Sequence, residues 1–144
     1  PTGLILLVTA SGGVLRYMLQ YSGLGEVIGN AVASAALPMV VVAFIVAALV
    51  RISVGSATVA MTMAAGIVAA MPGIAELSPL YLACVTAAVA GGATVCSHFN
   101  DSGFWLVKSL IGMDEKTTLK TWTIMETLVG GTGFLVALII SFFA

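Results

Sequence analysis

The sequence has very few charged residues for its size. Its 144 residues include five Lys or Arg and six Asp or Glu, so 8% of the chain is charged, while 60% is hydrophobic. The mean hydropathy is +1.18. A soluble domain has about 25% charged residues, because its surface must be hydrated. The scarcity of charge excludes water as the main solvent of this 14.6 kDa chain and predicts that it lies in a lipid bilayer.

Basic clusters and cysteine frameworks are also absent. The net charge is −1 and no basic run occurs, which argues against a nucleic-acid partner. Cys84 and Cys96 have neither metal-ligand nor secreted-scaffold spacing, so we expect buried free thiols, no metal and no cofactor. The first residue is Pro1, and no basic segment precedes the first apolar run. We therefore expect the chain to begin partway through a longer protein.

Two short apolar runs, residues 37–50 and 59–71, flank a polar segment at 51–58. At 1.5 Å per residue each run reaches roughly 20 Å, whereas the hydrocarbon core of a bilayer is ~30 Å thick. Runs of this length are more typical of re-entrant segments than of full spans. Together with Pro38 and the polar tip, they predict a re-entrant helical hairpin over 37–71. Two full membrane spans are the alternative.

Residues 80–112 form a long apolar segment with polar groups in its middle. As one straight helix this segment would be ~50 Å long, well beyond the ~30 Å of hydrocarbon. Glycines frame its polar part, residues 94–102, on both sides. A broken helix explains both the excess length and the buried polarity. Residues 120–144 are the last apolar segment and are long enough to span a membrane.

The remaining segments complete the predicted topology. Residues 1–11 are expected to be the end of a spanning helix, and the periodicity of 12–35 predicts an amphipathic connecting helix at the membrane interface. The positive-inside rule places the 112–120 loop in the cytoplasm, because three lysines cluster around it: Lys108, Lys116 and Lys120. The fold class is therefore all-α: residues 1–144 form part of a polytopic membrane protein with a re-entrant hairpin, a broken helix and a C-terminal transmembrane helix.

The tip of the predicted hairpin is the first candidate site. Backbone N–H and C=O groups are unpaired at helix ends, and the N-terminal end of the second half-helix favours an anion. A glycine allows a ligand to approach the chain closely, and hydroxyls can donate or accept hydrogen bonds. The candidate binding residues here are Ser53, Gly55, Ser56 and Thr58. The alternative is an ordinary polar turn at the membrane surface, with Arg51 extending toward the headgroups.

The break in the second segment is the other candidate site. An Asp deep in a membrane segment costs roughly 2.5–3.5 kcal/mol, so Asp101 and His98 are functional candidates. Asn100 and Asp101 offer oxygens for a proton, a small cation or sugar hydroxyls. One alternative is a polar network that only joins helices, or a loop outside the membrane. The least favoured alternative is intramembrane hydrolysis by Ser97 or Ser102 with His98, because no G-x-S-x-G motif is present. We expect Glu126 to have a capping or interfacial role.

Three segments, residues 54–62, 97–107 and 118–127, resemble the gluconate permease family, proton symporters for gluconate and related sugar acids. The resemblance extends over nearly the whole chain and corresponds to the C-terminal part of the family's proteins. It implies a fold of inverted repeats, each with a re-entrant hairpin and a broken helix, and it assigns the hairpin to 37–71. Phe99 departs from the smaller aliphatic residue expected there, which bears on substrate size.

The resemblance implies a secondary transporter that takes up gluconate or a related sugar acid with a proton; Na⁺ as the coupling ion is left open. The tip residues would bind the substrate carboxylate, and Asn100 and Ser102 its hydroxyls. Asp101, with His98 as second choice, would carry the proton. The expected partners are the sugar acid, the bilayer and an N-terminal repeat of the same protein, and a homo-oligomer is left open. The expected location is the inner (plasma) membrane. A structural packing fragment without its own site is the alternative, and it predicts no cavity between the tip and residues 97–103.

Overall fold

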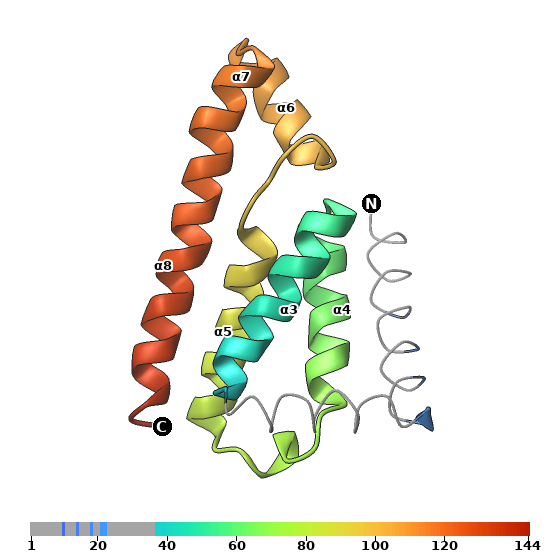
Figure 1. The fold of residues 1–144 in the computed structure, drawn as a ribbon, viewed down its shortest axis with the longest axis vertical. Coiled ribbons are helices and arrows are strands. Elements are labelled where there is room, and N and C mark those ends of the chain that lie inside the picture. The colour runs from blue at the N-terminus through green and yellow to red at the C-terminus, as the bar shows by residue number, and fades with distance from the viewer. Residues whose placement is uncertain (1–9, 11–13, 15–17, 19–20, 23–36) are drawn as a thin grey trace.

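The computed structural model describes residues 10, 14, 18, 21–22 and 37–144, and the regular secondary structure of these residues is helical. The predicted helix end at 1–11 and the predicted connecting helix at 12–35 lie outside the described residues, apart from isolated positions. Figure 1 shows the described helices lying roughly along one direction.

The first two helices form an antiparallel hairpin. Helix α3 (Met39–Val54) begins directly after Pro38 and ends at Gly55, which has a left-handed φ of 80°. Helix α4 (Ala57–Ala69) begins at once, because the Ser56 side chain accepts a hydrogen bond from the Val59 N–H at 3.4 Å. The helices have 16 and 13 residues and are therefore about 24 and 20 Å long, less than a hydrocarbon core.

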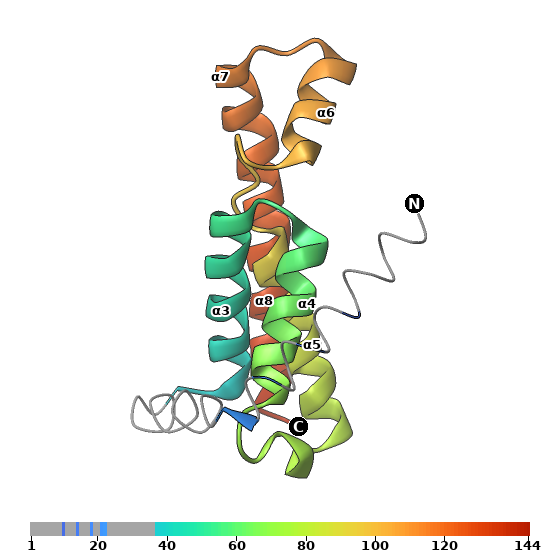
Figure 2. The same cartoon turned by 90° about the vertical axis from the view of Figure 1, so that its right-hand side faces the viewer.

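The next segment is interrupted as predicted. After a 3₁₀ turn, η1 (Ile74–Glu76), helix α5 (Pro79–Thr94) starts with a proline in its first turn and the Ser78 hydroxyl as its cap. It stops where Val95 becomes extended. Helix α6 (Ser102–Ile111) starts only after six further non-helical residues, 96–101. Both views show this break beside the tip of the α3–α4 hairpin (Figures 1 and 2).

The chain closes with one long helix. Helix α7 (Glu115–Thr118), a turn of π-helix η2 (Leu119–Thr123) and α8 (Ile124–Ser141) follow one another without a gap. Over Glu115–Ser141 this helix has 27 residues, its most apolar stretch of 18 residues has a mean hydropathy of 1.8, and it is long and apolar enough to cross a membrane. It starts five residues before the predicted boundary at 120, because Asp114 caps it.

The core of the described helices is built from small side chains. Most of the fully buried residues on α3, α4 and α5 are alanine or valine. A Cβ at Gly91 would lie 2.7 Å from the Gly130 carbonyl oxygen on α8, and one at Gly92 would collide with the Phe44 carbonyl on α3. Close backbone approach through small residues is the usual way in which helices pack in lipid. This packing holds α5 between the hairpin and α8 and so fixes the break beside the hairpin tip.

Candidate functional site

The hairpin tip and the helix break, about fifty residues apart in sequence, are in direct contact. The Asn100 side-chain amide donates to the Ile52 carbonyl at 2.8 Å. A Cβ added to Gly55 would collide with the Asn100 carbonyl oxygen and would lie 2.6 Å from its carbon. Glycine is thus required at the tip both for its φ of 80° and for this contact. The two polar segments that the sequence singled out form one junction.

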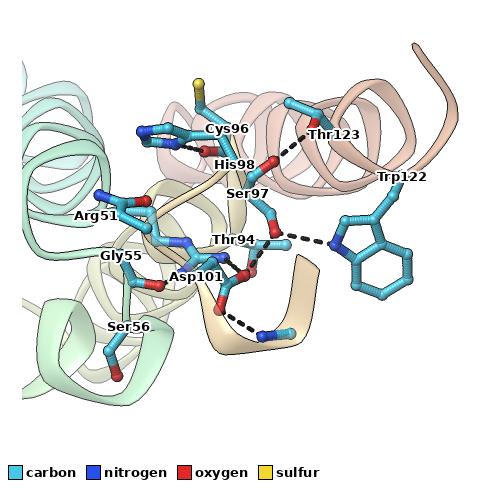
Figure 3. A network of polar contacts seen from close by, with 12 residues as sticks. Arg51, Gly55, Ser56, Thr94, Cys96, Ser97, His98, Asp101, Trp122 and Thr123 are labelled. Atoms are coloured by element: carbon cyan, nitrogen blue, oxygen red, sulfur yellow. Dashed lines mark hydrogen bonds and ion pairs between the residues drawn. The ribbon is translucent and has the colours of Figure 1, made fainter. Parts of the chain in front are cut away.

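A buried ion pair lies at the centre of this junction. Arg51, in the last turn of α3, is 3% exposed, and its Nη2 lies 2.6 Å from Asp101 Oδ2 (Figure 3). Its Nη1 donates to the Gly55 carbonyl. A cation in the last turn also interacts favourably with the helix dipole. The alternative of a polar turn at the membrane surface with Arg51 extending toward the headgroups is wrong, because the Arg51 side chain is buried and paired with Asp101.

Asp101 has further donors besides the guanidinium. The Ser97 hydroxyl donates to Oδ2 at 2.5 Å, and the Gly103 N–H donates to Oδ1 at 2.9 Å. The second bond makes Asp101 the N-cap of α6. Asp101 is only 8% exposed. Charge-assisted hydrogen bonds of this kind are roughly twice as strong as neutral ones, so the carboxylate is well supported in its buried position.

The π-helical turn of the closing helix holds the break from the other side. Trp122 Nε1 donates to the Ser97 hydroxyl at 2.9 Å, and the Thr123 hydroxyl donates to the Ser97 carbonyl. The Cys96 N–H donates to the Thr127 hydroxyl at 3.1 Å. These bonds fix Cys96 at a φ of 57°, which is unusual for a residue with a side chain. π-turns are frequent at functional sites, and this one contacts the break directly.

The other predicted tip residues are arranged differently from the prediction. The Ser56 hydroxyl caps α4, and Figure 3 shows it pointing away from Asp101, so the two do not face one another across a gap. Ser53 is exposed, and its hydroxyl donates to the Leu49 carbonyl of its own helix. Thr58 and Ser102 are exposed near the start of their helices. Gly55 and Asp101 therefore belong to the junction, whereas Ser53 does not join its hydrogen bonds.

His98 is engaged within the break. Its Nδ1 lies 2.8 Å from the Cys96 carbonyl oxygen. Among the hydrogen bonds of the described residues none joins a serine hydroxyl to His98, which is the geometry that the hydrolase alternative requires. Within residues 37–144 no group of three or more His, Cys, Asp and Glu side chains lies together that could hold a metal ion.

Arg51 and Glu126 belong to the surroundings of the junction, although the sequence analysis did not include them among the candidate site residues. Arg51 provides the cation of the junction, and its Nε is the one buried side-chain nitrogen or oxygen of the described residues without a hydrogen-bond partner. Glu126 lies in the first turn of α8, but it is the twelfth residue of the continuous Glu115–Ser141 helix and makes no capping hydrogen bond, so the structure does not show the capping half of the expected capping or interfacial role. It is half-buried and within electrostatic reach of Arg51 and Asp101. The sequence feature that could have identified Glu126 is its position inside a long apolar segment.

Two apolar cavities of the described residues lie away from the ion pair. One apolar cavity lies between α4 and α5, near Val68 and Val85, and another lies between α6 and the closing helix, near Ile111 and Met125. Neither is lined by the ion pair. Arg51 occupies the position where a space between the tip and the break was expected. What the arrangement offers chemically is one buried cation and one buried carboxylate, held by polar groups from three separate segments.

Comparison with known proteins identifies the kind of protein to which this junction belongs. A family model described as GntP family permease matches residues 1–143. The chain belongs to the GntP permease family. It is 46% identical over 141 residues to the low-affinity gluconate transporter of Escherichia coli K12, and 40% identical over 141 residues to the gluconate permease of Pseudomonas aeruginosa. It is also 37% identical over 138 residues to the L-idonate transporter of the Gnt-II system of Escherichia coli K12.

These alignments cover 96–98% of this chain but only about 31% of each relative. No solved structure matches the chain significantly. Membership of a permease family makes the chain an inner-membrane protein and not an enzyme, so the hydrolase alternative falls. The resemblance seen in the three sequence segments is confirmed, and so is the all-α membrane fold class.

Proposed function

We propose that the protein, at its full natural length, is a secondary transporter that takes up gluconate or a related sugar acid together with a proton. The family match and the gluconate and idonate transporters among its relatives support the substrate class. The observation that carries the proposal is the junction of Arg51 and Asp101, where a half-helix hairpin meets a broken helix. Interrupted helices that meet in this way are the usual substrate sites of secondary transporters.

In this proposal the substrate carboxylate binds at the hairpin tip, close to Gly55 and the capped start of α4 at Ser56. Asn100 and Ser102 bind the sugar hydroxyls from the break. Asp101 carries the coupling proton, with His98 as second choice, because a carboxyl group can change its charge as it moves between dry and hydrated surroundings. The roles of Ser53 and Thr58, and coupling to H⁺ rather than Na⁺, are further parts of the prediction.

The proposed topology places the 112–120 loop in the cytoplasm and an N-terminal repeat of the same protein against this chain. A homo-oligomer is also compatible with it. A single cysteine introduced at Lys116, in a variant without the native cysteines, should react with a membrane-impermeant maleimide only in inside-out vesicles. Labelling of right-side-out vesicles would reverse the proposed orientation.

The transport function is tested with the full-length protein in proteoliposomes. A proton gradient directed into the vesicles should drive accumulation of labelled gluconate. A proton ionophore should abolish this accumulation. An inward Na⁺ gradient without a pH gradient is the control. Accumulation driven by Na⁺ alone would reassign the coupling ion, and failure to accumulate any sugar acid under either gradient would contradict the transporter proposal.

A further inference from the structure

We propose that Arg51 binds the substrate carboxylate, and that it does so by exchanging the carboxylate of Asp101 for that of the substrate when Asp101 takes up a proton. This inference rests on the proposed function and names the residue and the exchange that would couple the proton to the sugar acid.

The first support is the geometry of Arg51. A guanidinium has five N–H donors in a planar fork and binds a carboxylate best through two of them. Here Asp101 is reached at 2.6 Å by Nη2, Nη1 donates to the Gly55 carbonyl, and the buried Nε has no partner among the described residues. The cation is therefore incompletely satisfied in a site from which water is largely excluded. Once Asp101 releases the guanidinium, a second carboxylate at the hairpin tip can pair with Nη2 and this unpartnered Nε.

The second support is that Asp101 keeps its place without its charge. Its Oδ1 accepts from the Gly103 N–H, and a neutral carboxyl group can continue to accept that bond. Its Oδ2 lies 2.5 Å from the Ser97 hydroxyl. A proton arriving on Oδ2 can be donated to the oxygen of Ser97, while Trp122 continues to donate to the same oxygen. Protonation thus removes the bond of Asp101 to Arg51 and reverses its bond with Ser97, whose hydroxyl hydrogen must turn away from Oδ2.

The third support is the balance of charge. In the empty site the charges of Arg51 and Asp101 sum to zero. After the exchange, the guanidinium pairs with the substrate carboxylate, Asp101 is neutral, and the sum is again zero. Substrate without a proton would leave Asp101 unpaired and buried, and a proton without substrate would leave Arg51 unpaired and buried. Both half-loaded states are strongly disfavoured in a low-dielectric site, so the geometry enforces coupling of one proton to one carboxylate.

Other ionisable groups surround the pair and must be distinguished from Asp101. Glu126 on the closing helix is within electrostatic reach of both partners, and His98 lies in the same break. Helices α4 and α5 carry no Asp, Glu, Lys, Arg or His. On α6, Lys108 is paired with Glu115 at 2.7 Å. Glu126 is therefore the main rival as the proton-binding group.

The test uses the full-length protein in proteoliposomes with two assays: net gluconate uptake driven by a pH gradient, and gluconate exchange at equal pH on both sides. In Asp101→Asn the competing carboxylate is absent, so Arg51 can bind the substrate without uptake of a proton. We expect exchange to persist and to become independent of pH, while net uptake driven by pH is lost. Glu126→Gln, the matched acid-to-amide control, should keep pH-driven uptake. Loss of pH dependence in Glu126→Gln with its retention in Asp101→Asn would overturn the assignment.

Arg51→Gln leaves a buried unpaired carboxylate and is expected to fold poorly. The double variant Arg51→Gln with Asp101→Asn removes both charges and should remain folded, which size-exclusion chromatography and a melting curve verify. We expect its apparent affinity for gluconate to fall by roughly 30-fold or more relative to Asp101→Asn, since one partner of a buried charge pair is lost. Affinity of the double variant within about threefold of Asp101→Asn would overturn the role of Arg51.

The stoichiometry adds an independent readout. One carboxylate moving with one proton transfers no net charge, so a potassium diffusion potential set by valinomycin should leave the initial rate of wild-type uptake unchanged. A rate that follows the potential would overturn the one-for-one exchange. If instead the wild-type protein transported no sugar acid at all, the proposed function would fail before this inference was reached, and the two failures are thereby distinguished.

Discussion

Replacing Gly55 with alanine should separate the hairpin tip from the helix break. Gly55 has a φ of 80° and ends α3. An added Cβ would lie 2.6 Å from the Asn100 carbonyl carbon, whereas ordinary contacts begin at 3.4 Å, so the tip must withdraw by 3.4 − 2.6 = 0.8 Å or more. The bond from Asn100 to the Ile52 carbonyl is 2.8 Å long and would then exceed normal hydrogen-bond length. The junction would open.

The chain provides two controls that share the backbone strain but not the contact. Gly112 ends α6 with a φ of 73°, and Gly73 has a φ of 78°. Nothing lies within 4 Å of a Cβ built at either position. Alanine in the left-handed region costs roughly 1–2 kcal/mol wherever it is placed. The control variants measure the cost of this backbone strain alone. The additional loss of stability in Gly55→Ala measures the contact between the tip and the break.

The variants are compared in the full-length protein by thermal unfolding in detergent and by gluconate uptake in proteoliposomes. Gly112→Ala and Gly73→Ala should each lose about 1–2 kcal/mol of stability and retain uptake. Gly55→Ala should lose more stability than either, and its uptake should fall about tenfold or more, since misplacing a site by 1 Å can lower a rate by about 100-fold. If Gly55→Ala matched the two controls in both assays, the close approach of the tip to the break would be refuted.

Three further predictions concern the supports of the junction. Gly130→Ala should destabilise the protein, because its Cβ would lie 2.9 Å from the Val95 side chain at the break and collide with a carbonyl of α5. Gly131→Ala, with nothing within 4 Å of its Cβ, should instead gain up to about 1 kcal/mol of stability. Melting curves that rank the two variants the other way would contradict the packing. Trp122→Phe should lose about 0.5–1.5 kcal/mol, measured by the same melts, because the donor to Ser97 disappears, and an unchanged stability would show that this bond contributes nothing. The hydrogen bonds that cap α7 hold the pKa of Asp114 below its usual 3.8, so their stabilisation is present above that value and lost as the pH falls through the lowered one. The protection of the α7 amides, measured as hydrogen exchange relative to the intrinsic rate at each pH, should decrease there in wild type and be low at all pH values in Asp114→Ala. Equal protection in both would exclude the cap.

The helix boundaries of the described region could largely be predicted from local signals. Proline before α3, glycine at the hairpin tip and the polar interruption after residue 94 all act within a few residues of the chain, so the sequence contains them directly. The start of the last helix was misplaced because the apolar pattern begins at 120, whereas the cap that starts the helix is Asp114. As a consequence, Glu126 is preceded by about three turns of continuous helix.

The pairing of Arg51 depends on tertiary structure, but in lipid the possible partners could have been reduced to two acidic residues by elimination. Between residues 37 and 107 Arg51 is the one Lys or Arg, and the acidic residues are Glu76 and Asp101. Glu76 lies in the connection between two prolines, at the far end of the hairpin from Arg51. A buried cation in hydrocarbon needs an anion, which leaves Asp101 and, in the last apolar segment, Glu126; the structure pairs Arg51 with Asp101. In water this reasoning would fail, because solvent can satisfy either charge. The same scarcity of charge that identifies the bilayer therefore also limits which charges can meet inside it.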